Sequence, residues 1–168
     1  GYNNIRLQRY SAAYDIFCGR RDPPLSYYTS NYSLPFGVWS GVKSGHLAEV
    51  VTTLKTYKEK NGETFYYHLA QAFILADQKN HKNAINHLEA ARSNMWAKEW
   101  RYFPWYQLVE ACEWLYEDTA YIGYRDLVLK FAKICQKIRY ESAWSYAVEA
   151  KYTDSESDRL RALGITLY

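Results

Sequence analysis

The sequence predicts an all-α protein, and three observations support that class. Amphipathic segments with apolar residues three and four positions apart recur along the chain, as in helices that bury one face. No stretch shows the sustained alternation of apolar and polar residues that is typical of a half-buried strand. The 168 residues include only 8 glycines and 4 prolines, which excludes collagen-like and disordered classes. We therefore expect one domain built from helical hairpins.

The first predicted element is a leading helix over residues 3–18. Its inward-facing residues are Ile5, Ala12, Ala13, Ile16 and Phe17. Gly19 and the Asp22-Pro23-Pro24 loop disfavour helix and predict its end.

The other predicted helices pair into four units, which span residues 31–64, 65–98, 105–140 and 141–168. Their helices cover residues 35–43 and 46–60, 63–78 and 81–95, 105–118 and 123–139, and 141–152 and 156–168. Pro35 suits a first helical turn, and Asn61-Gly62 is typical of a helix C-terminus. The Thr153-Asp154-Ser155 turn supplies a cap for the last helix.

Two of these amphipathic segments match at a separation of 34 residues. The matching pairs are Val50 with Ala84, Leu54 with Leu88, and Tyr57 with Ala91. That period and the stretch from Leu69 to Ala91 resemble the tetratricopeptide repeat, a helix–turn–helix unit.

The resemblance places small and large residues where the helices of such a repeat touch. In the register that starts the second unit at residue 65, Ala72, Ala84 and Ala91 take small positions and Leu88 a large one. In the third unit, Leu127, Phe131 and Ile134 take the positions of the second helix. Departures from the family pattern are His68, Gln71 and Trp96.

What the resemblance implies is an α-α superhelix, a right-handed solenoid of about three to four tetratricopeptide-like hairpins. The alternatives are another array of helical hairpins and an irregular helical bundle.

The chain is rich in aromatic residues, with 6 Trp, 18 Tyr and 6 Phe. In the family that it resembles, the first helices of the repeats line a concave groove that holds a peptide or a partner helix. Carried over by register, the expected partner-binding residues are Tyr32, Trp39, Tyr66, Phe73, Tyr106, Glu113 and Tyr116. Aromatic rings dominate binding hot spots. Core packing is the alternative for the aromatic residues among them.

The groove positions argue against one subfamily. Its members clamp the C-terminal carboxylates of a chaperone with a Lys and an Asn at the fifth and ninth positions. Here those positions hold Pro35 and Trp39, then Leu69 and Phe73. A carboxylate clamp is therefore not expected.

Charges recur at helical spacing on two neighbouring predicted helices. The acidic set is Glu110, Glu113 and Glu117, and the basic set is Lys130, Lys133 and Lys137. If the helices are antiparallel neighbours, Glu117 lies opposite Lys130 and Glu110 opposite Lys137. We expect exposed ion pairs, each worth about 0–1 kcal/mol; a binding stripe is the alternative.

No catalytic, metal or cofactor site is predicted. The sequence lacks a P-loop, a Gly-x-Gly-x-x-Gly and a Gly-x-Ser-x-Gly motif. The four histidines, His46, His68, His81 and His87, show no zinc-ligand spacing. Cys18, Cys112 and Cys135 are expected to be small buried hydrophobes. A net charge of +3 argues against a nucleic-acid partner, and no apolar run approaches the length of a membrane span.

These patterns predict a non-catalytic module that binds a protein or peptide on an aromatic groove. Alternatives are a helical domain that binds carbohydrate or a small ligand, and a structural domain of a larger protein. An uncapped end of the solenoid would allow a homodimer. Since Gly1 is not a translation start, we expect a removed leader or a cut from a longer chain. The cytoplasm is the favoured compartment, with a secreted or periplasmic location as the alternative.

Overall fold

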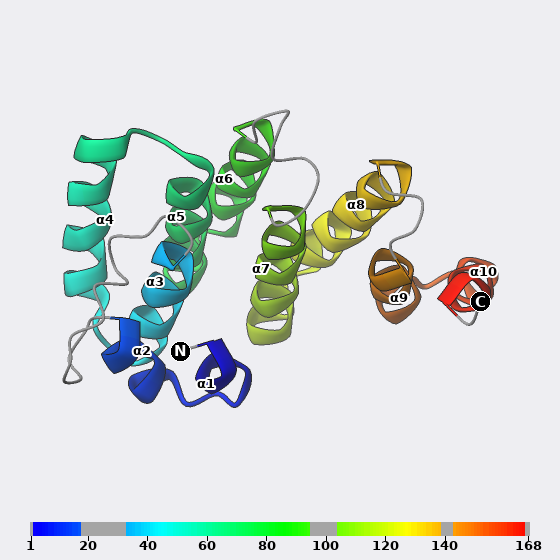
Figure 1. Cartoon of the computed structure of the whole chain (residues 1–168), viewed down its shortest axis with the longest axis horizontal. Coiled ribbons are helices and arrows are strands. Elements are labelled where there is room, and N and C mark those ends of the chain that lie inside the picture. Colours follow the sequence, from blue (N-terminus) through cyan, green and yellow to red (C-terminus); the bar gives the residue numbers. More distant parts are fainter. Residues whose placement is uncertain (1, 18–32, 95–103, 139–142, 167–168) are drawn as a thin grey trace. The chain divides into compact units, whose positions relative to one another are not determined.

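The computed structural model describes residues 2–17, 33–94, 104–138 and 143–166, and these residues form helices without any strand (Figure 1). The predicted all-α class is therefore confirmed for this part of the chain. The helices are α1 (Tyr2–Arg6), α2 (Tyr10–Phe17), α3 (Leu34–Lys43), α4 (Leu47–Asn61), α5 (Phe65–Asp77), α6 (His81–Ser93), α7 (Pro104–Thr119), α8 (Ile122–Ile138), α9 (Ala143–Tyr152) and α10 (Glu156–Thr166).

The chain divides into two compact units, Gly1–Asn94 and Met95–Tyr168. The first holds α1 to α6 and the second holds α7 to α10. That all 168 residues form one domain stays a prediction.

The predicted leading helix is two helices in the structure. The prediction of a continuous helix over residues 3–18 is wrong, because α1 ends at Arg6 and α2 begins at Tyr10. Between them Gln8 has a φ of 55°, in the left-handed region that a helix cannot continue through. The Gln8 amide bonds back to the Ile5 carbonyl at 2.8 Å and closes the short first helix.

The helices from α3 onward begin and end within a few residues of the predicted bounds, and their caps explain why. Gly62, with a φ of 75°, ends α4 as predicted. The Thr64 hydroxyl accepts from the Tyr67 amide at 3.2 Å and caps α5. Ser155 does the same for α10, since its hydroxyl accepts from the Asp158 amide at 3.2 Å. The predicted turn and cap before the last helix are thus confirmed.

In the first unit, α3 packs against α2, α4 and α5, and α5 packs on α6. The four interface positions expected in the second predicted unit, Ala72, Ala84, Leu88 and Ala91, are all completely buried. The helices α5 and α6 pack on each other, and the burial expected at these four positions is confirmed.

In the second unit, α8 packs against α7 and α9, and α9 packs on α10. Leu127 and Phe131 of α8 are buried as expected, and Ile134 is half-buried. A completely buried carboxylate, Glu149 of α9, accepts hydrogen bonds from Gln136 of α8 at 2.8 Å and Arg161 of α10 at 2.9 Å. Polar groups as well as apolar ones therefore tie α8, α9 and α10 together.

No helix among the described residues is both long enough and apolar enough to cross a membrane.

Candidate functional site

The predicted binding residues of the second unit lie together on one side of α7. Tyr106, Glu113 and Tyr116 recur at helical spacing, and the structure sets this side against α9. The Tyr106 ring lies 5.0 Å from the ring of Trp144, centre to centre, and the Tyr116 ring lies 5.9 Å from that of Tyr152. We call the seven residues gathered here the α7–α9 face: Tyr106, Glu113, Tyr116, Glu117, Trp144, Lys151 and Tyr152.

A lysine lies between the two carboxylates of this face. The Nζ of Lys151 is 2.8 Å from Glu117 Oε1 and 3.4 Å from Glu113 Oε1. The Tyr152 hydroxyl also donates to Glu117 Oε1, at 3.1 Å, and Lys151 Nζ stands 4.6 Å from the centre of the Tyr152 ring. One ammonium group thus bridges two carboxylates, which leaves the three groups with a net negative charge when all are ionised.

Burial differs sharply between the two carboxylates. The Glu113 side chain is 16% exposed, whereas that of Glu117 is 54% exposed. Burial raises the pKa of Glu113, and the charge of Lys151 opposes this rise. Burial disfavours the charge of Lys151, but its hydrogen bonds to Glu117 and Tyr152, together with the charge of Glu113, outweigh burial and raise its pKa. The face therefore holds a poorly solvated carboxylate beside a lysine that stays charged.

Three residues of this face were missed by the sequence reasoning. Trp144, Lys151 and Tyr152 belong to α9, for which no family register was assigned. A signal was present, because Lys151 follows Trp144 by seven residues and therefore lies on the same side of a helix. Only the packing of α7 and α9 on α8 shows that this side meets Tyr106 and Glu113.

Two residues of the predicted charge sets on α7 and α8 pair with residues of α9 and α10. Glu117 pairs with Lys151 of α9. Lys133 of α8 lies 3.6 Å from Glu149 of α9 and 4.0 Å from Asp158 of α10. The predicted pairings of Glu117 with Lys130 and of Glu110 with Lys137 stay predictions. Residues of α9 and α10 supply partners that the pairwise prediction left out.

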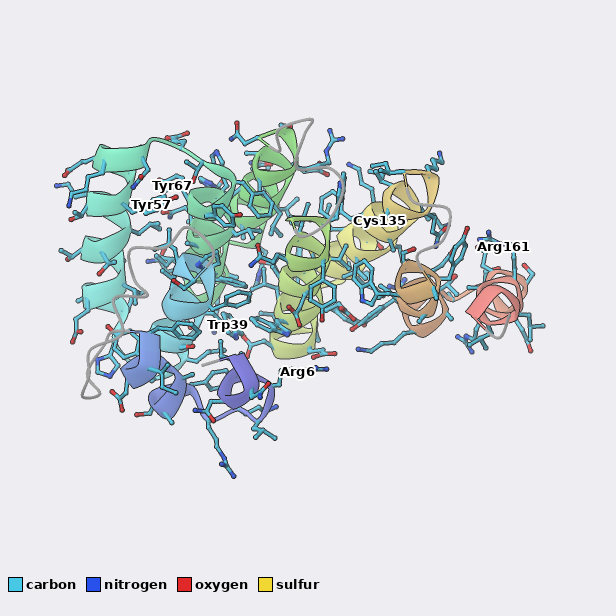
Figure 2. The ribbon with its side chains drawn as sticks, viewed as in Figure 1. Arg6, Trp39, Tyr57, Tyr67, Cys135 and Arg161 are labelled. Carbon is cyan, nitrogen blue, oxygen red and sulfur yellow. The ribbon has the colours of Figure 1, made fainter. Side chains whose placement is uncertain are left out.

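Three of the predicted binding residues of the first unit, Trp39, Tyr66 and Phe73, are buried, which corrects the expectation of an open aromatic groove there. Figure 2 labels Trp39 of α3. Trp39 is 2% exposed, Phe73 1% and Tyr66 7%. The Trp39 ring lies 4.9 Å from the Phe73 ring and 6.3 Å from the Tyr10 ring, so residues of α5 and α2 cover it. Tyr32 lies outside the described residues.

The described residues offer little for metal or thiol chemistry. No group of three or more His, Cys, Asp or Glu side chains among them is arranged to hold a metal ion. Cys112 and Cys135 are buried, as predicted, and burial raises the pKa of Cys135 to about 12. That thiol therefore stays protonated near neutral pH, and a protonated thiol is a poor nucleophile. Cys18 lies outside the described residues.

Comparisons with protein-family models, with curated proteins and with solved structures find no match to this chain. The resemblance to the tetratricopeptide repeat therefore stays a prediction that rests on the sequence pattern.

Proposed function

We propose that this chain is a non-catalytic, tetratricopeptide-like interaction module that binds a peptide through the α7–α9 face. The observation that carries the proposal is the meeting of Tyr106, Glu113 and Tyr116 with aromatic and charged residues of α9. These three positions are the ones that the resemblance assigns to partner binding, and they share one surface with Trp144 and Lys151.

The chemistry of the face suits a peptide. Tyr106, Tyr116 and Trp144 are each half-buried, so part of each ring stays open to solvent. Partly exposed aromatic rings give large contact areas with little loss of side-chain entropy. Glu117 and Lys151 are both 54% exposed and can bond backbone amide and carbonyl groups of a bound chain.

The face is also held in place before any partner arrives. Both α7 and α9 pack on α8, and the bonds from Lys151 to Glu113 and Glu117 join α7 to α9 directly. A preformed surface loses less entropy on binding, so more of the contact energy appears as affinity.

The order in which the helices pack along the chain supports the proposal of a helical repeat. Helices that follow each other in the chain pack as pairs: α3 with α4, α5 with α6, α7 with α8, and α9 with α10. The first helices of the first two pairs, α3 and α5, also pack on each other. This arrangement, together with the 34-residue match between α4 and α6, supports a tetratricopeptide-like array.

The test is a selection of peptides from a displayed random library on the immobilised full chain. The double variant Tyr106→Ala/Tyr116→Ala removes both α7 rings from the face. We expect it to bind the selected peptides at least about tenfold more weakly, because loss of a hot-spot side chain costs at least about 2 kcal/mol. The matched control is Tyr121→Ala, which removes a 39% exposed tyrosine outside the face.

Retention of the same peptides by the double variant, with its helicity intact by circular dichroism, would place the binding surface elsewhere. Enrichment of no peptide at all would contradict the proposal. A glycan array read by tryptophan fluorescence tests carbohydrate binding, the alternative that the aromatic composition left open.

A further inference from the structure

Two histidines face each other between α5 and α6. The Nδ1 atoms of His68, on α5, and His87, on α6, lie 2.9 Å apart, and the ring centres lie 5.1 Å apart. His68 is 5% exposed and His87 is half-buried. Since α5 and α6 pack along each other, this contact belongs to the interface of the hairpin.

A hydrogen bond between two ring nitrogens requires one hydrogen between them. When both imidazoles are neutral, one Nδ1 carries the hydrogen and the other accepts it. A first added proton is tolerated, because a charged imidazole still donates to a neutral one. A second added proton puts hydrogens on both Nδ1 atoms, so the bond is lost and two positive charges face each other.

The surroundings do little to stabilise a doubly charged pair. The nearest carboxylate is Glu63, whose Oε2 lies 3.9 Å from His68 Nε2, but its Oε1 is already 2.5 Å from the Nζ of Lys58 on α4. The Tyr67 ring stands edge-on to both imidazoles at 5.4 and 6.3 Å. Among the described residues of α3, no charged group shifts the pKa of either imidazole.

Burial and charge act in the same direction on this pair. Burial lowers the pKa of both histidines, and the charge of His87 lowers the pKa of His68 further. Glu63 opposes this lowering for both rings, and Lys58 adds to it. The folded hairpin therefore holds fewer protons on this pair than an open hairpin does under mildly acidic conditions.

We propose that His68 and His87 form a proton-operated latch between α5 and α6. The hairpin stays closed while the pair carries no added proton or one added proton. It opens when the second added proton binds. This inference is independent of the proposed binding function, because it concerns only contacts inside the first unit.

The sign of the pH dependence follows from proton linkage. In the open hairpin each imidazole has its usual pKa of about 6.5, whereas in the closed hairpin the pKa is lower. As the pH falls below about 6.5, the open form binds more protons than the closed form. The equilibrium constant for opening then rises about tenfold per pH unit for each extra proton.

The experiment is amide hydrogen exchange on the full chain from about pH 7.5 to about pH 5, corrected for the pH dependence of free amides. In the wild type, we expect opening of α6 to increase about tenfold per pH unit below about pH 6.5, while α8 in the same molecule serves as the internal reference. In the His87→Gln variant, the glutamine side chain can turn its amide oxygen toward a charged His68 and accept a hydrogen bond from it. We therefore expect the opening of α6 in this variant to increase less than about threefold per pH unit. His81→Gln makes the same change on the same helix outside the pair and should behave as the wild type.

Protection of α6 that does not change with pH in the wild type would overturn the proposal. So would a His87→Gln variant that keeps the full wild-type dependence. If circular dichroism shows that this variant is unfolded at pH 7.5, imidazole nitrogen resonances of the wild type decide the matter. Two proton steps separated by more than about one pH unit support the latch, and two coincident steps near pH 6.5 refute it.

Discussion

Aromatic residues that the sequence assigned to one binding groove have different surroundings in the two units. Trp39 and Phe73 pack on each other in the core of the first unit, whereas Tyr106 and Tyr116 keep part of their surface exposed in the second. Helical spacing places each side chain on a face of its helix, but what covers that face depends on a distant residue such as Tyr10. Periodicity alone therefore does not decide which of these aromatic rings stay open to solvent.

Two glycines give a prediction at this scale. A Cβ added at Gly41 would lie 2.7 Å from Cε2 of Tyr14 and would also overlap Cγ1 of Val50, so α2, α3 and α4 would have to move apart. We expect Gly41→Ala to lower the free energy of unfolding by about 1–3 kcal/mol. At Gly164 of α10 nothing lies within 4 Å of an added Cβ, and Gly164→Ala should raise it by about 0.5–1 kcal/mol.

Urea unfolding of the two variants beside the wild type measures both changes. If Gly41→Ala were as stable as the wild type, α2, α3 and α4 would pack less tightly around Gly41 than the structure shows.

Helices at the end of the chain are held by a mixture of apolar packing and buried charge. A cluster of Tyr146, Ala150 and Ala162 forms a small apolar contact between α9 and α10. Beside it, the completely buried carboxylate of Glu149 takes hydrogen bonds from Gln136 and Arg161. Because this apolar cluster is small among the described residues, we expect the attachment of α10 to depend strongly on this carboxylate.

We therefore expect Glu149→Gln to destabilise the second unit and to expose α10 first. The substitution removes the negative charge between Arg161 and Lys133 and places an amide NH2 among donors. Since both cations are about half exposed, they can regain water, and we expect a loss of about 1–3 kcal/mol in the free energy of unfolding.

Asp154→Asn is the matched control, because its 76% exposed carboxylate also pairs with a cation of α8, Arg125. An exposed pair contributes less than a buried one, so the change should be smaller. Urea unfolding gives the stabilities, and hydrogen exchange locates the loss in α10. Equal effects of the two substitutions would argue against a special role for burial at Glu149.

At the scale of the whole molecule, the chain consists of two compact units with separate sets of completely buried side chains. The first set includes Leu34, Phe73 and Leu88, and the second includes Leu115 and Phe131. A unit with its own core can fold alone. The division after Asn94 lies close to the predicted end of the second helical pair at residue 98.

We expect the fragments 1–94 and 95–168, expressed separately, each to show a helical circular dichroism spectrum and a cooperative urea transition. The physical reason is that buried apolar area drives folding and each unit buries its own. A fragment that is unfolded on its own would show that its core is incomplete without the other half of the chain.

The sequence by itself determined the all-α class and the positions of α3 to α10 within a few residues. It also predicted the burial of the small residues Ala72, Ala84 and Ala91 on α5 and α6. These features are encoded locally, in apolar spacing of three and four residues and in helix-ending or capping residues such as Gly62 and Ser155. Within the part of the chain that the structure describes, a local signal failed at Gln8, where a residue with no special turn preference adopts a left-handed conformation.

Only the tertiary structure decided which faces are covered and which polar groups meet. The contacts from His68 to His87, from Glu149 to Arg161 and from Glu113 to Lys151 join residues 19, 12 and 38 positions apart. Such pairs depend on the angle and register at which helices pack, and these arise from many side chains acting together. For this reason the periodic pattern predicted the helices and the residues that share each helix face. The α7–α9 face and the contact of His68 with His87 could be identified only from the way the helices pack.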